Sequence, residues 1–172
     1  MMPRGAGPLA VSLLLVAGCG FHLRGVGIES AVESAEIREV GRVALSRDLA
    51  RALEAAGVNV VEAGPAEVTI ELLGQTEDKR GISVTDRART AEYELSLDVR
   101  YRVLGADATE LLEERVARIE RIYRLDQSNI VGSHEEEALV RREMVQEAVR
   151  QIVYSLDAAT RARSTTGAGA TR

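Results

Sequence analysis

The chain has 172 residues, a formal net charge of −5 and 45% hydrophobic residues, with one Cys, one Phe and no Trp. A mildly acidic chain is not expected to bind nucleic acids non-specifically, and a single Cys excludes an internal disulfide bond. About 150 residues follow residue 18, which suffices for one domain with a mainly aliphatic core.

The first 18 residues have the layout of a bacterial lipoprotein signal peptide. Arg4 provides a charged start, an apolar run extends from Leu9 to Val16, and small residues precede Cys19. The apolar run is shorter than the roughly 20 residues that a membrane-spanning helix needs. We therefore predict a signal peptide over 1–18 and a lipidated Cys19, whose thiolate is the nucleophile that takes up the lipid. The alternative is an ordinary signal peptide with an incidental cysteine.

Residues 19–34 are expected to form a tether that leads into a single domain over 35–163. Leu45, Leu49 and Leu53 recur at helical spacing, which predicts an amphipathic helix ended by Gly57. Short strands are predicted over 35–40, 58–61, 68–72 and 93–103. In the last of these strands one face is apolar and the other is charged, so one face covers a core and the other meets water or a partner.

Residues 111–125 fit two patterns. Leu112, Val116, Ile119 and Tyr123 have helical spacing, whereas the alternation of apolar residues with arginines also fits a strand. Periodicity alone slightly favours the helix.

The last element is predicted to be a long helix. Ser133-His134-Glu135-Glu136 has the pattern of a capping box, in which the helix starts at Ser133. An apolar stripe between Val145 and Leu156 would pack on the sheet, and the small polar residues 164–172 are predicted to be a disordered tail. The expected fold class is α+β, a two-layer sandwich in which an antiparallel or mixed sheet of about four strands packs against two helices.

Four basic residues, Lys79, Arg80, Arg87 and Arg89, fall in the connection between two predicted strands. Such a connection is expected to be an exposed loop, and arginine binds phosphate through paired hydrogen bonds. The cluster is therefore a candidate phosphate-binding site. The alternative is a solvated loop whose charge is neutralised by neighbouring acidic residues.

The search for catalytic or metal-binding motifs gives no candidate. His22 and His134 are far apart in sequence and have no zinc-binding spacing. The chain contains no Gly-x-Ser-x-Gly elbow, no phosphate-binding Walker loop and no dinucleotide fingerprint. We therefore expect no enzymatic activity, no cofactor and no metal.

The stretch from Cys19 to Gly25 resembles the mature start of the LptE family of lipopolysaccharide-assembly lipoproteins. Thr90 to Leu95 resembles the opening of the family's best-marked strand, and Arg121 to Asp126 resembles its last strand. The resemblance extends to about Ala159 and favours a strand over 111–125.

This resemblance implies a lipoprotein of the outer membrane, for which Gly20 after the lipidated cysteine is suitable. It implies an LptD β-barrel as the partner, which the domain would plug, and lipopolysaccharide as the ligand of Lys79, Arg80, Arg87 and Arg89. The protein would act by binding, without covalent chemistry. The alternatives are an unrelated outer-membrane lipoprotein with a structural or interaction role, and a lipid-anchored hydrolase, for which the sequence offers no nucleophile and base.

Overall fold

The computed structural model describes residues 31–84, 90–126 and 128–169, with side chains over 31–83, 92–126 and 128–163. The predicted signal peptide, Cys19 and His22 lie outside the described residues. The elements in chain order are β1 (Ser34–Glu39), α2 (Ser46–Ala55), β2 (Asn59–Val61), β3 (Val68–Val84), β4 (Thr90–Gly105), β5 (Glu110–Asp126) and α3 (Ile130–Gly169).

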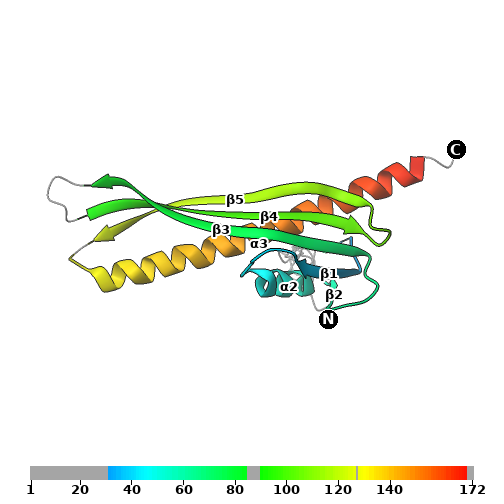
Figure 1. Cartoon of the computed structure of the whole chain (residues 1–172), viewed down its shortest axis with the longest axis horizontal. Helices are drawn as coiled ribbons and strands as arrows, with labels where there is room; N and C mark the ends of the chain where they lie inside the picture. Colours follow the sequence, from blue (N-terminus) through cyan, green and yellow to red (C-terminus); the bar gives the residue numbers. More distant parts are fainter. Residues whose placement is uncertain (1–30, 85–89, 127, 170–172) are drawn as a thin grey trace, which may run out of the picture.

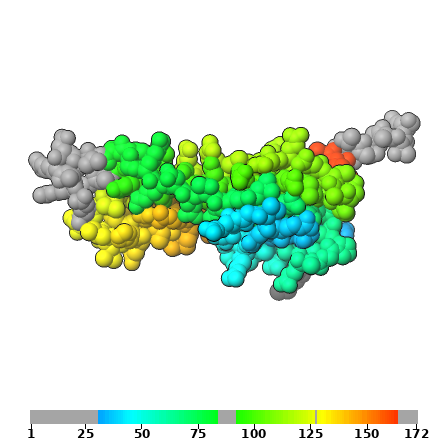
Figure 2. All heavy atoms as spheres, in the orientation of Figure 1, coloured from blue at the N-terminus to red at the C-terminus, as the bar shows by residue number. Residues whose placement is uncertain are grey.

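The strands form one mixed sheet in the order β2-β1-β3-β4-β5. β1 is parallel to both of its neighbours, whereas β3, β4 and β5 are antiparallel. The predicted α+β class with two helices on a mixed sheet is confirmed, with five strands instead of about four. Figure 1 shows α3 running along the long sheet, while α2 lies beside β1 and β2. The molecule is elongated, and the unit of β1, α2 and β2 occupies one half of it (Figure 2).

The hydrophobic core lies between one face of the sheet and the two helices. The buried residues of β4 alternate along the strand, as predicted: Leu95, Leu97, Val99, Tyr101 and Val103. The buried residues of α3 recur at helical spacing: Met144, Ala148, Ile152 and Leu156. Each such aliphatic side chain stabilises the fold by roughly 1.5–3 kcal/mol through the loss of contact with water. The hydroxyl of Tyr101 also donates to Ser155 Oγ at 2.9 Å, which joins β4 to α3 by a polar contact.

Gly57 ends α2, as the sequence predicts. Its φ of +85° is in the left-handed region that glycine adopts without strain. The amide of Val58 donates to the Leu53 carbonyl and the amide of Gly57 donates to the Glu54 carbonyl, both at 3.0 Å. These two bonds form a Schellman motif, which satisfies the last carbonyls of the helix.

The predicted capping box at Ser133 is wrong, because α3 begins earlier, at Ile130. Asn129 caps the helix, since its Oδ1 accepts from the amide of Gly132 at 3.1 Å. Ser133 is buried and accepts from the Asp126 amide at 2.9 Å, so it joins the end of β5 to the helix instead. At its other end α3 continues to Gly169, whereas residues 164–172 were predicted as a disordered tail. Residues 170–172 of that tail lie outside the described residues.

Residues 111–125 belong to a strand, which confirms the expectation from the family resemblance. The helical alternative required Val116 on the buried side, but Val116 is 47% exposed and pairs with Arg100 on the outer face. The register shifts where β5 passes Tyr101 and Val103, and this irregularity places both Leu112 and Ala117 on the buried face. An odd spacing between two buried residues breaks simple alternation, which explains why periodicity favoured a helix.

β3 is far longer than the predicted strand 68–72, because it continues beside β4 as far as Val84. A register shift between Leu72 and Gly74 occurs where β1 ends. There the chain after β1 passes very close to β3, and the amides of Val40 and Gly41 both donate to the Leu72 carbonyl. A Cβ atom on Gly41 would lie 2.1 Å from the carbonyl oxygen of Leu73, so only glycine fits.

We therefore expect Gly41→Ala to lower the free energy of unfolding by more than about 2 kcal/mol, because backbone atoms on both sides must move. Urea denaturation followed by circular dichroism measures the change. Gly81→Ala in β3 is the matched control, since its Cβ would meet Tyr93 Cε1 at an ordinary 3.8 Å. Equal stability of the two variants would show that the approach of residue 41 to β3 does not constrain the fold.

Candidate functional site

In the described part of the chain one face of the sheet has no helix packed on it, and most of the side chains on that face are charged. We call this surface the ion-pair face. Its charged members come from β1, β3, β4 and β5: Glu36, Arg38, Glu71, Arg80, Glu92, Glu94, Asp98, Arg100, Arg102, Glu114, Arg118 and Arg124. Strand alternation places most of them there, because their neighbours in the strand point to the helix side.

Glu71 is the most buried charge on the ion-pair face, with 6% exposure. Its two carboxylate oxygens are held by different arginines, Arg102 Nε at 2.7 Å and Arg38 Nη1 at 3.1 Å. The hydrogen bond from Arg102, together with that from Arg38, lowers the pKa of Glu71 although burial opposes this shift. Three adjacent strands, β1, β3 and β4, are thereby joined by side chains as well as by their backbones.

The remaining pairs repeat this arrangement between β3, β4 and β5. Arg118 binds Asp98 through two parallel hydrogen bonds of 2.8 and 2.6 Å, and these lower the pKa of Asp98. Arg80 Nε lies 2.7 Å from Glu94, and Arg124 Nε lies 3.0 Å from Glu92. The face is thus charged, and most of its charges already have partners.

A second polar cluster lies on the helix side of the sheet, near the end where β5 is followed by α3. We call it the Glu137 cluster. Lys79 Nζ of β3 donates to the buried Glu137 carboxylate at 2.8 Å, and Tyr123 of β5 and Arg141 of α3 also donate to it. Lys79 Nζ lies 4.6 Å from the ring centre of Tyr93, so the ammonium group has a favourable cation–π contact. The cluster binds the first half of α3 to β3 and β5.

Burial raises the pKa of Glu137, but hydrogen bonds from Lys79, Tyr123 and Arg141 outweigh it and hold the pKa at about 2. Burial and the bond to Glu137 raise the pKa of Tyr123, so the phenol keeps the proton that it donates. Burial lowers the pKa of Lys79, but its contacts with Glu137 and Tyr123 give a net increase. All of these groups therefore keep, at neutral pH, the protonation states that the cluster requires.

The structure corrects the prediction that four basic residues share one exposed loop. Lys79 and Arg80 belong to β3, not to a loop, and as neighbours in a strand they point to opposite faces. Lys79 is part of the Glu137 cluster, whereas Arg80 pairs with Glu94 on the ion-pair face. Arg87 and Arg89 lie outside the described residues.

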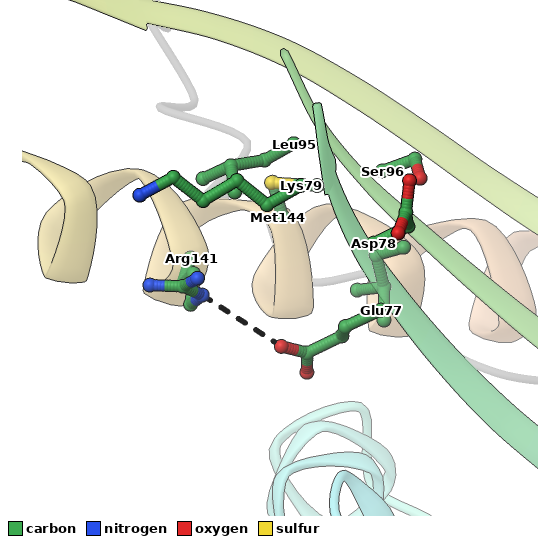
Figure 3. Close-up of a pocket in the computed structure, with 8 residues that line it drawn as sticks. Glu77, Asp78, Lys79, Leu95, Ser96, Arg141 and Met144 are labelled. Atoms are coloured by element: carbon green, nitrogen blue, oxygen red, sulfur yellow. Dashed lines mark ion pairs between the residues drawn. The ribbon is translucent and has the colours of Figure 1, made fainter. Parts of the chain in front are cut away.

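A cavity of about 90 Å³ lies between β3, β4 and α3 next to the Glu137 cluster. Figure 3 shows Leu95 and Met144 beside it, with Arg141 directed toward Glu77 at 3.8 Å. Its lining contains two carboxylates, Glu77 and Asp78, and two cations, Lys79 and Arg141, so the cavity has no clear preference for an anion. Within the described part of the chain, no three His, Cys, Asp or Glu residues are arranged to hold a metal ion. No helix of that part is long and apolar enough to span a membrane.

Sequence reasoning missed the Glu137 cluster. It gave no role to Glu137, and it placed Lys79 in a loop. One signal was available: Lys79 is the only lysine of the chain, and Tyr93 and Tyr123 are both predicted on apolar faces. The strand register brings these two rings together, with centres 5.8 Å apart.

The profile of the LptE family, described as lipopolysaccharide-assembly, matches residues 31–156. Two curated relatives called LPS-assembly lipoprotein LptE are similar. That of Photorhabdus laumondii is 27% identical over 86% of this chain and 82% of its own length. That of Pectobacterium atrosepticum is 25% identical, with the same coverage of both chains.

Solved structures of lipoproteins have the same fold. The solution structure of lipoprotein B from Nitrosomonas europaea has a TM-score of 0.72 and 28% identity, covering 83% of this chain and 94% of that chain. The crystal structure of rare lipoprotein B from Shewanella oneidensis has a TM-score of 0.65 and 21% identity, covering 77% of this chain and 99% of that chain. This second likeness concerns the fold alone.

The Glu137 cluster predicts a specific loss of stability in acid. The pKa of Glu137 is about 2 in the folded chain, against an ordinary 4.5. Its contribution is therefore complete above pH 4.5 and is lost as the pH falls toward 2. The shift corresponds to a contribution on the order of 3 kcal/mol. We expect Glu137→Gln to be clearly less stable than the wild type at pH 6, and the difference to shrink toward pH 2.

Urea denaturation at several pH values measures this difference. Glu136→Gln changes the neighbouring, exposed residue of the same helix turn and should differ little from the wild type at any pH. A gap between Glu137→Gln and the wild type that stayed constant from pH 6 to pH 2 would contradict the assigned ionisation.

Proposed function

Because the chain belongs to the LptE family, a family of lipopolysaccharide-assembly lipoproteins, we propose that it is an outer-membrane lipoprotein that works with an LptD β-barrel. Together they insert lipopolysaccharide into the outer leaflet of the outer membrane. The domain plugs the barrel and acts by binding and positioning, without covalent chemistry. Acylated Cys19 anchors it to the membrane.

The observation that carries this proposal is the ion-pair face. A barrel lumen is lined by polar and charged side chains, and a plug meets it through hydrogen bonds and mixed charges. Most charges of the ion-pair face are already neutralised by a neighbour, so their burial against such a wall costs less than the burial of lone charges. Both helices pack on the opposite face, which leaves this surface open along the whole length of β4.

The start of the described chain is fixed to α3. The amide of Ala31, the first described residue, donates to the buried Asp157 carboxylate at 3.2 Å, and Arg161 binds the other oxygen of that group at 2.6 Å. The chain that arrives from Cys19 is therefore fixed to α3 before β1 begins.

The barrel partnership can be tested with the Cys19→Ala chain, coexpressed with the LptD homologue and purified through a tag on either protein. We expect a stoichiometric complex, because the binding surface belongs to the folded domain and not to the acyl chains. Enclosure in a lumen buries more surface than a standard interface, so the complex should dissociate slowly.

A matched pair of variants tests the surface itself. Arg100→Glu reverses an exposed charge on the ion-pair face and should reduce the recovered complex, whereas Arg51→Glu on α2 makes the same change in the other layer and should not. If a properly folded barrel never retains the domain, the proposed partnership is wrong. If both variants are recovered equally, the ion-pair face is not the contact.

We place lipopolysaccharide binding near the end of the sheet where β3 and β4 are joined. Arg87 and Arg89 lie in that connection by sequence, and Arg80, with 67% of its side chain exposed, is the nearest described arginine of β3. Phosphates of lipid A would be bound by guanidinium groups in a bidentate manner. Both Lys79 and Arg80 are already paired, with Glu137 and Glu94, and Lys79 is the weaker candidate because its side chain is less exposed, at 33%.

Replacing both Arg87 and Arg89 by Glu should weaken lipopolysaccharide binding about tenfold at low salt, with little change in stability. Added salt should weaken the wild type more than the variant, because screening acts on exposed charges. Binding of fluorescent lipopolysaccharide to the purified lipoprotein measures both effects. The double variant Arg47→Glu and Arg51→Glu on α2 has the same change of charge and should bind like the wild type. Equal binding by all three proteins would remove this connection from the site.

A further inference from the structure

β5 leaves a long backbone edge without a partner in the described part of the chain. It is the last strand of the sheet, and it pairs only with β4 over its 17 residues. Such an edge presents a row of unpaired amides and carbonyls, which is a template for another strand. Natural proteins shield these edges with charges, and the order of the charges on β5 restricts the registers in which another strand can bind there.

Ile119, a buried residue, lies at the centre of this pattern of charges along β5. Arg118 and Glu120 flank it on the outer face, with opposite charges. Val116 and Ile122 lie three residues away on either side, and they are the large apolar side chains of β5 that stay exposed, at 47% and 61%. The sequence around Ile119 is therefore complementary to itself when read in the reverse direction.

We propose that two copies of the chain associate through their β5 edges, antiparallel and with a two-fold axis at Ile119. In this register Val116 of each copy lies opposite Ile122 of the other, and Arg118 lies opposite Glu120. Each of these favourable pairs occurs twice because of the symmetry. The two sheets become one continuous sheet, and both exposed apolar side chains of β5 gain a partner.

Charge excludes the registers one and two residues away. A two-fold axis perpendicular to the sheet keeps the outer faces on the same side, so opposed residues must share a face and the axis must pass through a residue. An axis at residue 118 would place Arg118 opposite Arg118 and Arg115 opposite Arg121. An axis at residue 120 would place Glu120 opposite itself. Like charges directly opposite each other are destabilising, so neither alternative competes.

The axis two residues away on either side fails for the same reason. At residue 117 it would oppose Glu114 and Glu120, and at residue 121 it would oppose Arg118 and Arg124. An axis at Ile122 would also oppose unlike charges, Glu120 and Arg124, and the single variant Ile122→Cys detects that register because it would then cross-link to itself.

The pairing goes beyond the proposed function, since it concerns the lipoprotein before it meets a barrel. A continuous sheet of two copies is too wide for a lumen filled by one copy, so the barrel and the second copy would compete.

Disulfide cross-linking tests the register directly. The double variant Val116→Cys and Ile122→Cys is purified as the lipidated full chain and oxidised, and covalent dimers are counted on a non-reducing gel. The proposed register opposes the two new cysteines across the interface, so most of the protein should become a covalent dimer. A bond within one copy is excluded, because six residues of strand span about 20 Å and a disulfide joins Cα atoms within about 7 Å.

Three variants serve as controls for the cross-link. Val116→Cys alone and Ile122→Cys alone have no cysteine opposite and should give few dimers. The pair Val116→Cys and Glu120→Cys is opposed only when the axis passes through residue 118, and it too should give few. Equal cross-linking of the single and double variants would overturn the proposed register.

Sedimentation of the detergent-solubilised lipoprotein provides the second measurement. The wild type should sediment as a dimer, and Glu120→Arg should weaken dimerisation by about tenfold or more, because two attractive pairs become repulsive. Glu54→Arg on the exposed face of α2 makes the same change elsewhere and should leave the dimer intact. A wild type that is monomeric at every concentration overturns the proposal. That result would leave the barrel partnership untouched, because the complex with LptD is measured separately.

Discussion

The described structure depends on one asymmetry: both of its helices, α2 and α3, pack on the same face of the sheet. α3 contributes a single apolar stripe, and this stripe needs the buried faces of β5 and β4 to remove it from water. The sheet in turn has no other apolar layer on its opposite side, so that side must be polar. The ion-pair face is therefore a direct consequence of a two-layer architecture, and the proposed function uses the surface that the core leaves free.

Two buried carboxylates mark the two faces. Glu71 lies on the ion-pair face between Arg38 and Arg102, and Glu137 lies on the helix side with Lys79 and Tyr123. A buried charge is tolerated only when its oxygens are satisfied, and both groups meet this condition with donors from different elements. Each carboxylate thus fixes the relative positions of strands or of a helix, which apolar contacts alone specify less strictly.

The order of the charges along β5, and not only their number, affects what its free edge can bind. The charges of β5 shield a free edge against most strands, yet they are complementary around Ile119. On the ion-pair face Asp98 and Arg118 neutralise each other across β4 and β5. An acidic chain can therefore present a surface that is nearly neutral locally, and such a surface suits a polar wall better than one of a single sign.

The sequence by itself determined the elements whose signals are local. The spacing of Leu45, Leu49 and Leu53 was enough for α2, and Gly57 was enough for its end, because both depend on neighbours within two turns. The alternation from Tyr93 to Val103 likewise predicted β4 and the side of it that is buried. The α+β class and the family followed from these elements and from the short motifs beside them.

Only the tertiary structure decided the length of β3, the strand at residues 111–125, and the partners of Lys79 and Arg80. β3 beyond Leu72 has no apolar alternation, and it is a strand because β4 provides its hydrogen bonds. The irregular register of β5 gave its buried residues a helical spacing, so periodicity could not distinguish strand from helix. Lys79 and Arg80 were expected together in a loop, yet strand geometry sends them to opposite faces. Hydrogen bonds between strands and partners for buried charges come from residues distant in sequence, and a local pattern contains no information about them.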